Sequence, residues 1–241
     1  MRLFLISVLV LVCVVSAAQF AASGEIQGDI DGIKNISNWQ KTHKRMAIFD
    51  AGGFSAKTET ANMEVCSFMQ VVNYSAIAMG YPELRFSADF WENANKKFPL
   101  PLVATNVKSP KKIFERIRTV QYDKSGEKYA VVAIVGDKDS EEISSDYEIE
   151  DPRAALTSVI SQIPNDYMII LIAHCEPALA DSLINEFPRI SFGVQGYEKI
   201  GDKPFRLVGH KKVLNFGGPN KIAYLDKKGN VYWREFYQKA K

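Results

Sequence analysis

The sequence carries almost no excess charge of either sign. The formal net charge of the 241-residue chain is +2 at neutral pH, so no strong field directs it toward nucleic acid or an anionic surface. Its lysines are scattered, and no basic stripe alternates with aromatic residues. Walker A and G-x-G-x-x-G sequences are also absent, and with them the signatures of the common nucleotide-phosphate loops. We therefore expect no nucleic-acid partner.

Cysteine is scarce as well, with three residues in the chain, Cys13, Cys66 and Cys175. Cys13 lies in an N-terminal apolar segment, so the pair Cys66 and Cys175 remains for the folded part. In an exported protein such a pair can close a disulfide. Both residues lie beside apolar runs, so two buried free thiols fit equally well. A thiol-dependent redox role is a third interpretation, because His174 adjoins Cys175. Adjacent side chains of an extended segment point to opposite faces, which argues against a working Cys/His pair.

The N-terminal segment has the pattern of a secretory signal peptide. Arg2 gives a charged start, residues 3–15 form an apolar core, and small residues at 16–18 and 21–23 offer cleavage sites. The apolar core is shorter than the roughly 20 residues that a membrane-spanning helix needs. We predict a signal peptide over residues 1–22 and a bacterial exported protein, periplasmic or in the cell envelope, with no integral span after cleavage. An uncleaved anchor is one alternative. Lipidation of Cys13 is another, which Val12 disfavours because a small residue normally precedes a lipidated cysteine.

The remaining residues, 23–241, show no repeat, low-complexity tract or linker, and we interpret them as a single domain. Apolar runs at Met46–Phe49 and Ala76–Met79 flank a helix-like segment, and each ends at a glycine turn, which is typical of a βαβ unit. The run Tyr167–Ala173 predicts a strand buried on both faces. Asp151-Pro152 predicts a helix N-cap followed by proline. Four short apolar segments near the C-terminus predict antiparallel strands. The fold class is therefore α/β.

Six short segments follow one another in a recognisable order. Together they resemble the motifs of the calcineurin-like metallophosphoesterases, and in particular the catalytic domain of bacterial exported 5'-nucleotidases and UDP-sugar hydrolases. The implied fold is a four-layer α/β/β/α sandwich with mixed sheets. The segments and the motifs that they resemble are Phe49–Phe54 (D-A-G-D-x-F), Asn73–Leu84 (Y-D-A-x-x-x-G-N-H-E-F), Pro101–Val107 (a strand ending in S-A-N), Ile170–Glu176 (L-L-S-H-x-G), Phe192–Tyr197 (G-G-H-x-H) and Gly217–Asp226 (G-x-x-G-K-x-x-G-x-L-D).

The resemblance implies two divalent metal ions, of Mn, Mg or Zn, held by Asp, His and Asn side chains from these loops. Such a pair activates a water molecule and binds the phosphate oxygens. The early D-x-H motif has no counterpart that we find in the sequence. His174 matches a ligand, and Asn106 and Glu83 match flanking positions. The other ligand or catalytic positions carry substitutions, at Gly53, Tyr81, Pro82, Gln195 and Tyr197.

These substitutions predict a site that has lost its metals. Glycine and proline side chains donate nothing, tyrosine is a neutral phenol with a pKa near ~10, and one imidazole does not hold a metal pair. We expect no cofactor, and a degenerate pseudoenzyme of the 5'-nucleotidase type that binds or scaffolds, with an envelope protein as partner. The alternative is a divergent phosphoester hydrolase with an atypical divalent-metal site. Its candidate residues are Asp50, Asn106, His174 and Gln195. Asp50 and His174 also have plainer interpretations, as a turn-stabilising carboxylate and a hydrogen-bonded loop histidine.

Overall fold

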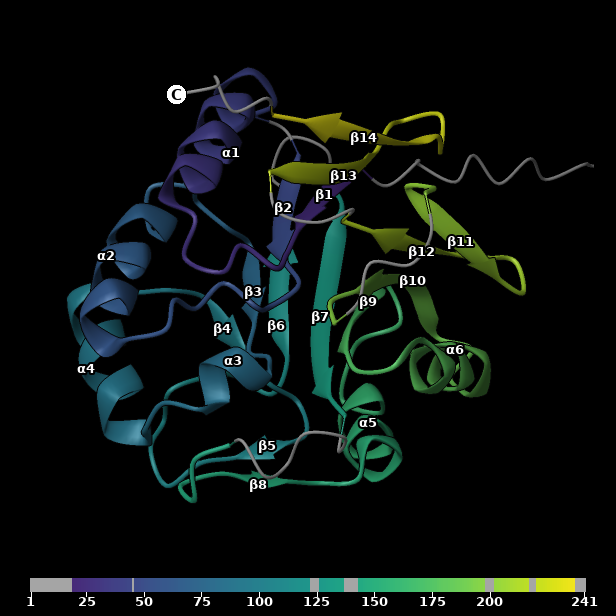
Figure 1. Ribbon diagram of the computed structural model, residues 1–241. Coiled ribbons are helices and arrows are strands. Elements are labelled where there is room, and N and C mark those ends of the chain that lie inside the picture. The colour runs from purple at the N-terminus through teal and green to yellow at the C-terminus, as the bar shows by residue number, and fades with distance from the viewer. Residues whose placement is uncertain are drawn as a thin grey trace, which may run out of the picture.

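The computed structural model describes residues 19–44, 46–121, 126–136, 143–197, 202–216 and 220–236. Within these ranges two six-stranded sheets pack face to face, and helices cover both outer faces (Figure 1). This is the four-layer α/β/β/α sandwich with mixed sheets that the resemblance implied. Most of the predicted signal peptide, including Cys13, lies outside the described residues, as do residues 217–219 of the last motif.

The first sheet has the strand order β14-β13-β1-β2-β3-β4, with β1 to β4 parallel and β13 and β14 antiparallel. Its outer face is covered by helices whose apolar side chains, such as Ile33 and Trp91, form one buried cluster with Ile48 and Ile77 of the sheet. The elements are β1 (Phe20–Ser23), α1 (Ile30–Thr42), β2 (Ala47–Asp50), α2 (Glu59–Met69), β3 (Ala76–Ala78), α3 (Tyr81–Leu84), α4 (Ala88–Lys97), β4 (Leu102–Val103), β13 (Lys221–Leu225) and β14 (Val231–Glu235).

The second sheet has the order β11-β12-β10-β9-β7-β6 and carries two helices on its outer face. Its elements are β6 (Arg118–Gln121), β7 (Lys128–Val135), α5 (Pro152–Ile160), β9 (Met168–His174), α6 (Pro177–Glu186), β10 (Ile190–Gln195), β11 (Phe205–Val208) and β12 (Lys211–Asn215). A separate two-stranded sheet joins β5 (Val107–Lys108) to β8 (Glu148–Ile149).

Strand β9 explains the most apolar run of the sequence. Ile170 and Ile172 point into the core between the two sheets, whereas Ile169 and Leu171 pack in the cluster under α5 and α6. A strand covered on both faces needs apolar residues at every position. The prediction of a doubly buried strand is therefore confirmed. The predicted N-cap of α5 is confirmed too, because the Asp151 side chain accepts a hydrogen bond from the Ala154 N–H at 2.8 Å.

Two features concern the ends of the domain. Phe20–Ser23 forms the buried strand β1 between β2 and β13, and three of its residues fall within the predicted signal peptide. Its small apolar residues continue the N-terminal apolar segment, which hid the strand. The C-terminal strands are also not all antiparallel, since β12 pairs in parallel with β10, while β13 joins the other sheet. In the described part of the chain, no helix has the length and apolar character to cross a membrane.

Candidate functional site

The loops that follow β2, β3, β9 and β10 meet at one edge of the sandwich, and His174 lies between them. Its Nδ1 is 3.3 Å from the Ala51 carbonyl oxygen, and the residue is 1% exposed. The ring occupies space that three glycines leave open. A Cβ atom on Gly80 would lie 2.5–2.6 Å from three imidazole atoms, and one on Gly52 or Gly196 would lie 3.1 Å from Nδ1. The strand ends therefore close around an imidazole.

Two tyrosines complete this enclosure. The Tyr81 and Tyr197 rings meet the His174 ring edge-on, with centroids 5.7 and 5.6 Å away, and they meet each other at 5.9 Å. Aromatic rings in such edge-to-face contacts pack favourably and exclude water. Both tyrosines stand where the resemblance places metal ligands. In this protein their rings contact the one matching histidine.

Asp50 is fully buried at the end of β2. Its Oδ2 accepts a hydrogen bond from the Ser23 hydroxyl at 2.7 Å, and its Oδ1 accepts one from the Gly52 N–H at 3.0 Å. Burial raises the pKa of this carboxyl to about 7. The hydrogen bond to Gly52 is the one that a turn-stabilising aspartate makes.

Glu83 is also fully buried and holds three loop amides together. Its Oε2 accepts from the N–H groups of Gly53 and Gly80 at 3.0 and 2.8 Å, and its Oε1 accepts from the Ser55 N–H at 2.8 Å. A carboxylate that receives three amide donors is a strong local anchor. Glu83 thus fixes the loops after β2 and β3 relative to each other.

Glu25 is the site residue that the sequence analysis missed. It follows β1, and its carboxylate lies over Gly53, where a Cβ atom would come within 2.5 Å of Oε1. Burial, helped by the nearby Glu83 and Asp50 carboxyls and opposed by a hydrogen bond from Gln27, raises its pKa to about 8. Glu25 and Gln27 have the spacing of the early D-x-H motif, so this spacing was the signal that could have found them. The Glu25 side chain, from the loop after β1, therefore fills the space beside Gly53.

Asn106 and Gln195 are committed to backbone groups. The Asn106 amide donates to the carbonyls of Val135 and Glu150, and its oxygen accepts from the Val135 N–H. The Gln195 amide donates to the carbonyls of Ala173 and Cys175. Its oxygen accepts from Arg206, which also pairs with Asp181. Both side chains therefore link strand ends to neighbouring backbone. None of these hydrogen bonds joins Asn106 to His174.

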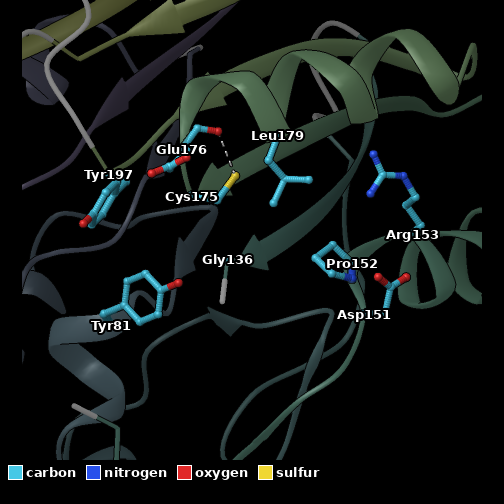
Figure 2. A pocket seen from close by; sticks show the side chains of 9 residues that line it. All are labelled: Tyr81, Gly136, Asp151, Pro152, Arg153, Cys175, Glu176, Leu179 and Tyr197. Atoms are coloured by element: carbon cyan, nitrogen blue, oxygen red, sulfur yellow. Dashed lines mark hydrogen bonds between the residues drawn. The ribbon is translucent and has the colours of Figure 1, made fainter. Parts of the chain in front are cut away.

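A pocket of about 390 Å³ opens beside the enclosed histidine (Figure 2). It lies where β7 and β9 end and α5 and α6 begin. The Tyr81 hydroxyl points toward Gly136 on its floor, and Leu179 projects into it from α6 (Figure 2). The lining residues are Tyr81, Gly136, Asp151, Pro152, Arg153, Cys175, Glu176, Leu179 and Tyr197.

No family model and no curated protein sequence matches the chain. Solved structures match it by shape. A 5'-nucleotidase precursor from Thermus thermophilus superposes with a TM-score of 0.70 at 14% identity, over 90% of this chain and 53% of that one. The NAD nucleotidase of Haemophilus influenzae superposes with a TM-score of 0.67 at 13% sequence identity, over 90% of this chain and 49% of that one. The calcineurin-like phosphoesterase YfkN from Bacillus subtilis superposes with a TM-score of 0.67 at 13% sequence identity, over 91% of this chain and 89% of that one.

The chain has the metallophosphoesterase fold. It spans about half the length of the two nucleotidases that it matches. At these identities the likeness establishes the fold, while activity and substrate have to be argued from the site.

The donor groups at the site do not fit the metal pair of the metallophosphoesterase fold. Position 53 has no side chain, and the Glu25 carboxylate takes its space. The oxygens of Asp50 and Glu83 already accept hydrogen bonds from the chain. Within the described ranges, no group of three or more His, Cys, Asp or Glu residues is placed to hold a metal ion. Divalent sites need several convergent ligands, and this arrangement does not supply them.

The two cysteines of the described chain are free thiols in different parts of the core. Cys66 packs under the helices of the first sheet, and Cys175 packs under those of the second. Burial raises the pKa of each to about 12. Since the thiolate is the reactive form, neither thiol is activated at neutral pH. The disulfide interpretation is wrong, and the geometry gives the redox interpretation no support.

Proposed function

We propose that this protein is an exported, catalytically inactive relative of the 5'-nucleotidase type that binds or scaffolds in the cell envelope. One observation supports the proposal: protein side chains pack closely against glycines of the loops after β2 and β3. The His174 imidazole lies against Gly80, and the Glu25 carboxylate lies against Gly53. Without the metals there is no Lewis acid and no activated water to attack a phosphoester.

A phosphatase assay tests this proposal. The purified mature protein is incubated with p-nitrophenyl phosphate or AMP and with Mn²⁺, Mg²⁺ or Zn²⁺ in turn. We expect hydrolysis at the rate of the buffer control, and the same rate for His174→Ala. Metal-dependent hydrolysis that His174→Ala abolishes would contradict the proposal and establish the alternative, a divergent hydrolase with an atypical site.

Export enters the same proposal through the N-terminal pattern. Cleavage beside the small residues 16–18 keeps β1 whole, whereas cleavage after residue 22 removes most of a buried strand. Mass spectrometry of the mature protein is expected to place its first residue before Phe20. A chain that starts at Ser23, or one that retains Met1, would contradict this part of the proposal.

A further inference from the structure

Exposed lysines gather at the edge of the sandwich opposite the candidate site, where strands β1 and β2 begin and β13 ends. We call this the basic edge, and its exposed lysines are Lys41, Lys44, Lys227 and Lys228. The segments that carry them are neighbours, because Phe20 of β1 pairs with Ala47 of β2 on one side and with Leu225 of β13 on the other. In Figure 1, α1 and the β13–β14 hairpin lie in the upper part of the view, and α3 and α5 lie in its lower part.

Positive charge is in excess at the basic edge. Among the described residues, none of the four lysines pairs with a carboxylate. Lys212 joins them, since its Nζ donates to the Gly229 carbonyl of the same turn. The opposing groups are Asp226, which accepts hydrogen bonds within this turn, and Glu127, which is 9% exposed and bonds the Tyr129 hydroxyl. The C-terminus of α1 adds about half a negative charge, so the excess is about two and a half positive units.

The chain enters the fold at this same edge. A hollow of about 320 Å³ opens there, and its lining residues are Gln19, Lys41, Thr42, His43, Lys44 and Met46. Gln19 directly precedes β1, and the apolar segment of residues 3–15 lies just upstream of it in the sequence. A secretory signal peptide brings its chain to a membrane during export. The excess positive charge therefore lies where the chain is attached to its predicted export signal.

Aromatic rings lie beside the hollow. Tyr232 is 43% exposed, and its ring stacks on that of Tyr224 with centroids 5.3 Å apart. The His43 ring stacks on Trp39 at 4.0 Å and lies 6.4 Å from the Tyr224 ring. Tyrosine combines an apolar ring with a polar hydroxyl, and it is enriched where proteins meet the headgroup level of a bilayer. An exposed tyrosine next to unpaired lysines suits a surface of lipid headgroups.

We infer that the basic edge binds the surface of an anionic phospholipid bilayer. The inference deepens the proposed envelope role and rests on it. Because the parallel strands β1, β2 and β3 run from the basic edge toward the candidate site, the site faces away from the bilayer. One lysine near an anionic membrane surface strengthens binding about fivefold, and salt screens this attraction when the lysine is exposed. Binding is therefore reversible and weakens as ionic strength rises.

Sedimentation of the mature protein with large vesicles tests the inference. The vesicles contain phosphatidylcholine alone, or phosphatidylcholine and phosphatidylglycerol in equal parts. We expect the protein to sediment only with the phosphatidylglycerol vesicles at about 50 mM salt, and to be released at about 500 mM. The double variants Lys41→Gln/Lys44→Gln and Lys227→Gln/Lys228→Gln should each weaken binding about 25-fold.

The matched control is the double variant Lys57→Gln/Lys112→Gln. It removes the same charge from exposed positions outside the basic edge and should bind like the wild type. All six substituted lysines are exposed, so the variants should fold normally, and urea denaturation checks this.

Four results would overturn the inference: no sedimentation with phosphatidylglycerol vesicles at low salt, binding that salt does not weaken, an equal loss in the control variant, or tighter binding to a single-stranded oligonucleotide at the same salt. The phosphatase assay is separate from this experiment. A protein that hydrolyses phosphoesters refutes the proposed inactivity, while a protein that ignores anionic vesicles refutes only the membrane contact.

Discussion

Gly80→Ala is expected to destabilise the protein by about 3 kcal/mol, because overpacking a closed site costs roughly 1–3 kcal/mol and sometimes more. The new methyl group would overlap the His174 ring, with three contacts of 2.5–2.6 Å. Gly80 has φ −109°, which any residue adopts, so the cost is steric and not conformational. The ring cannot swing away cheaply, since Gly52, Gly196 and the two tyrosines enclose it. Urea denaturation of both proteins measures the difference.

The double variant separates this steric effect from a general effect of alanine. With His174→Ala in place the methyl group has room, so we expect Gly80→Ala to cost less than about 1 kcal/mol there, a coupling of about 2 kcal/mol. Gly126→Ala is a useful comparison, because a Cβ there meets nothing within 4 Å and φ is +71°. Gly126→Ala should therefore lower the free energy of unfolding only by the cost of a left-handed backbone at alanine, about 1–2 kcal/mol. Equal costs of Gly80→Ala in both backgrounds would show that the imidazole does not fill this space.

Stability is expected to fall steeply as pH rises from about 4 to 8. Asp50 keeps its proton in the folded protein up to about pH 7, whereas the unfolded chain releases it near its ordinary value of 3.8. Between these values the folded state binds more protons, so the free energy of unfolding decreases with pH. At roughly 1.4 kcal/mol per pKa unit, Asp50 alone accounts for about 4 kcal/mol. Glu25, whose pKa is raised to about 8, acts in the same direction.

Chemical denaturation at several pH values checks this expectation. Asp50→Asn keeps the shape of the protonated carboxyl and cannot ionise, so its stability should vary much less between pH 5 and 8. Glu25→Gln should flatten the upper part of the same range. Asp31→Asn, at an exposed position on α1, is the matched control and should retain the wild-type slope. A wild-type protein that gains stability from pH 5 to 8, or an Asp50→Asn protein with the wild-type slope, would show that these carboxyls are not buried as described.

Local patterns predicted most of the fold. The apolar run that ends at Ala173 became β9, and Asp151-Pro152 became the start of α5. Strand β1 was missed because Phe20–Ser23 continues an apolar leader with small residues, and its burial depends on pairing with β13 some two hundred residues later. A pattern that depends on a distant partner leaves little trace in the local sequence.

The site was predicted only in part, for a similar reason. The substituted positions indicated which side chains are missing from the loops, but they did not show what packs beside them. His174 meets Ala51 across 123 residues of chain, and Gly52 and Gly80 look like ordinary turn glycines in the sequence. Glu25 was missed because its side chain reaches over Gly53 from a different loop, the one after β1. Steric complementarity between loops is a tertiary property, and no local window contains it.

The central claim is that side chains occupy the place of the metal pair, and metal content tests it most directly. The mature protein is dialysed against excess Mn²⁺, then against metal-free buffer, and analysed by inductively coupled plasma mass spectrometry. The account predicts far less than one metal ion per chain, with no change for His174→Ala. Two ions per chain in the wild type, lost in His174→Ala, would contradict it.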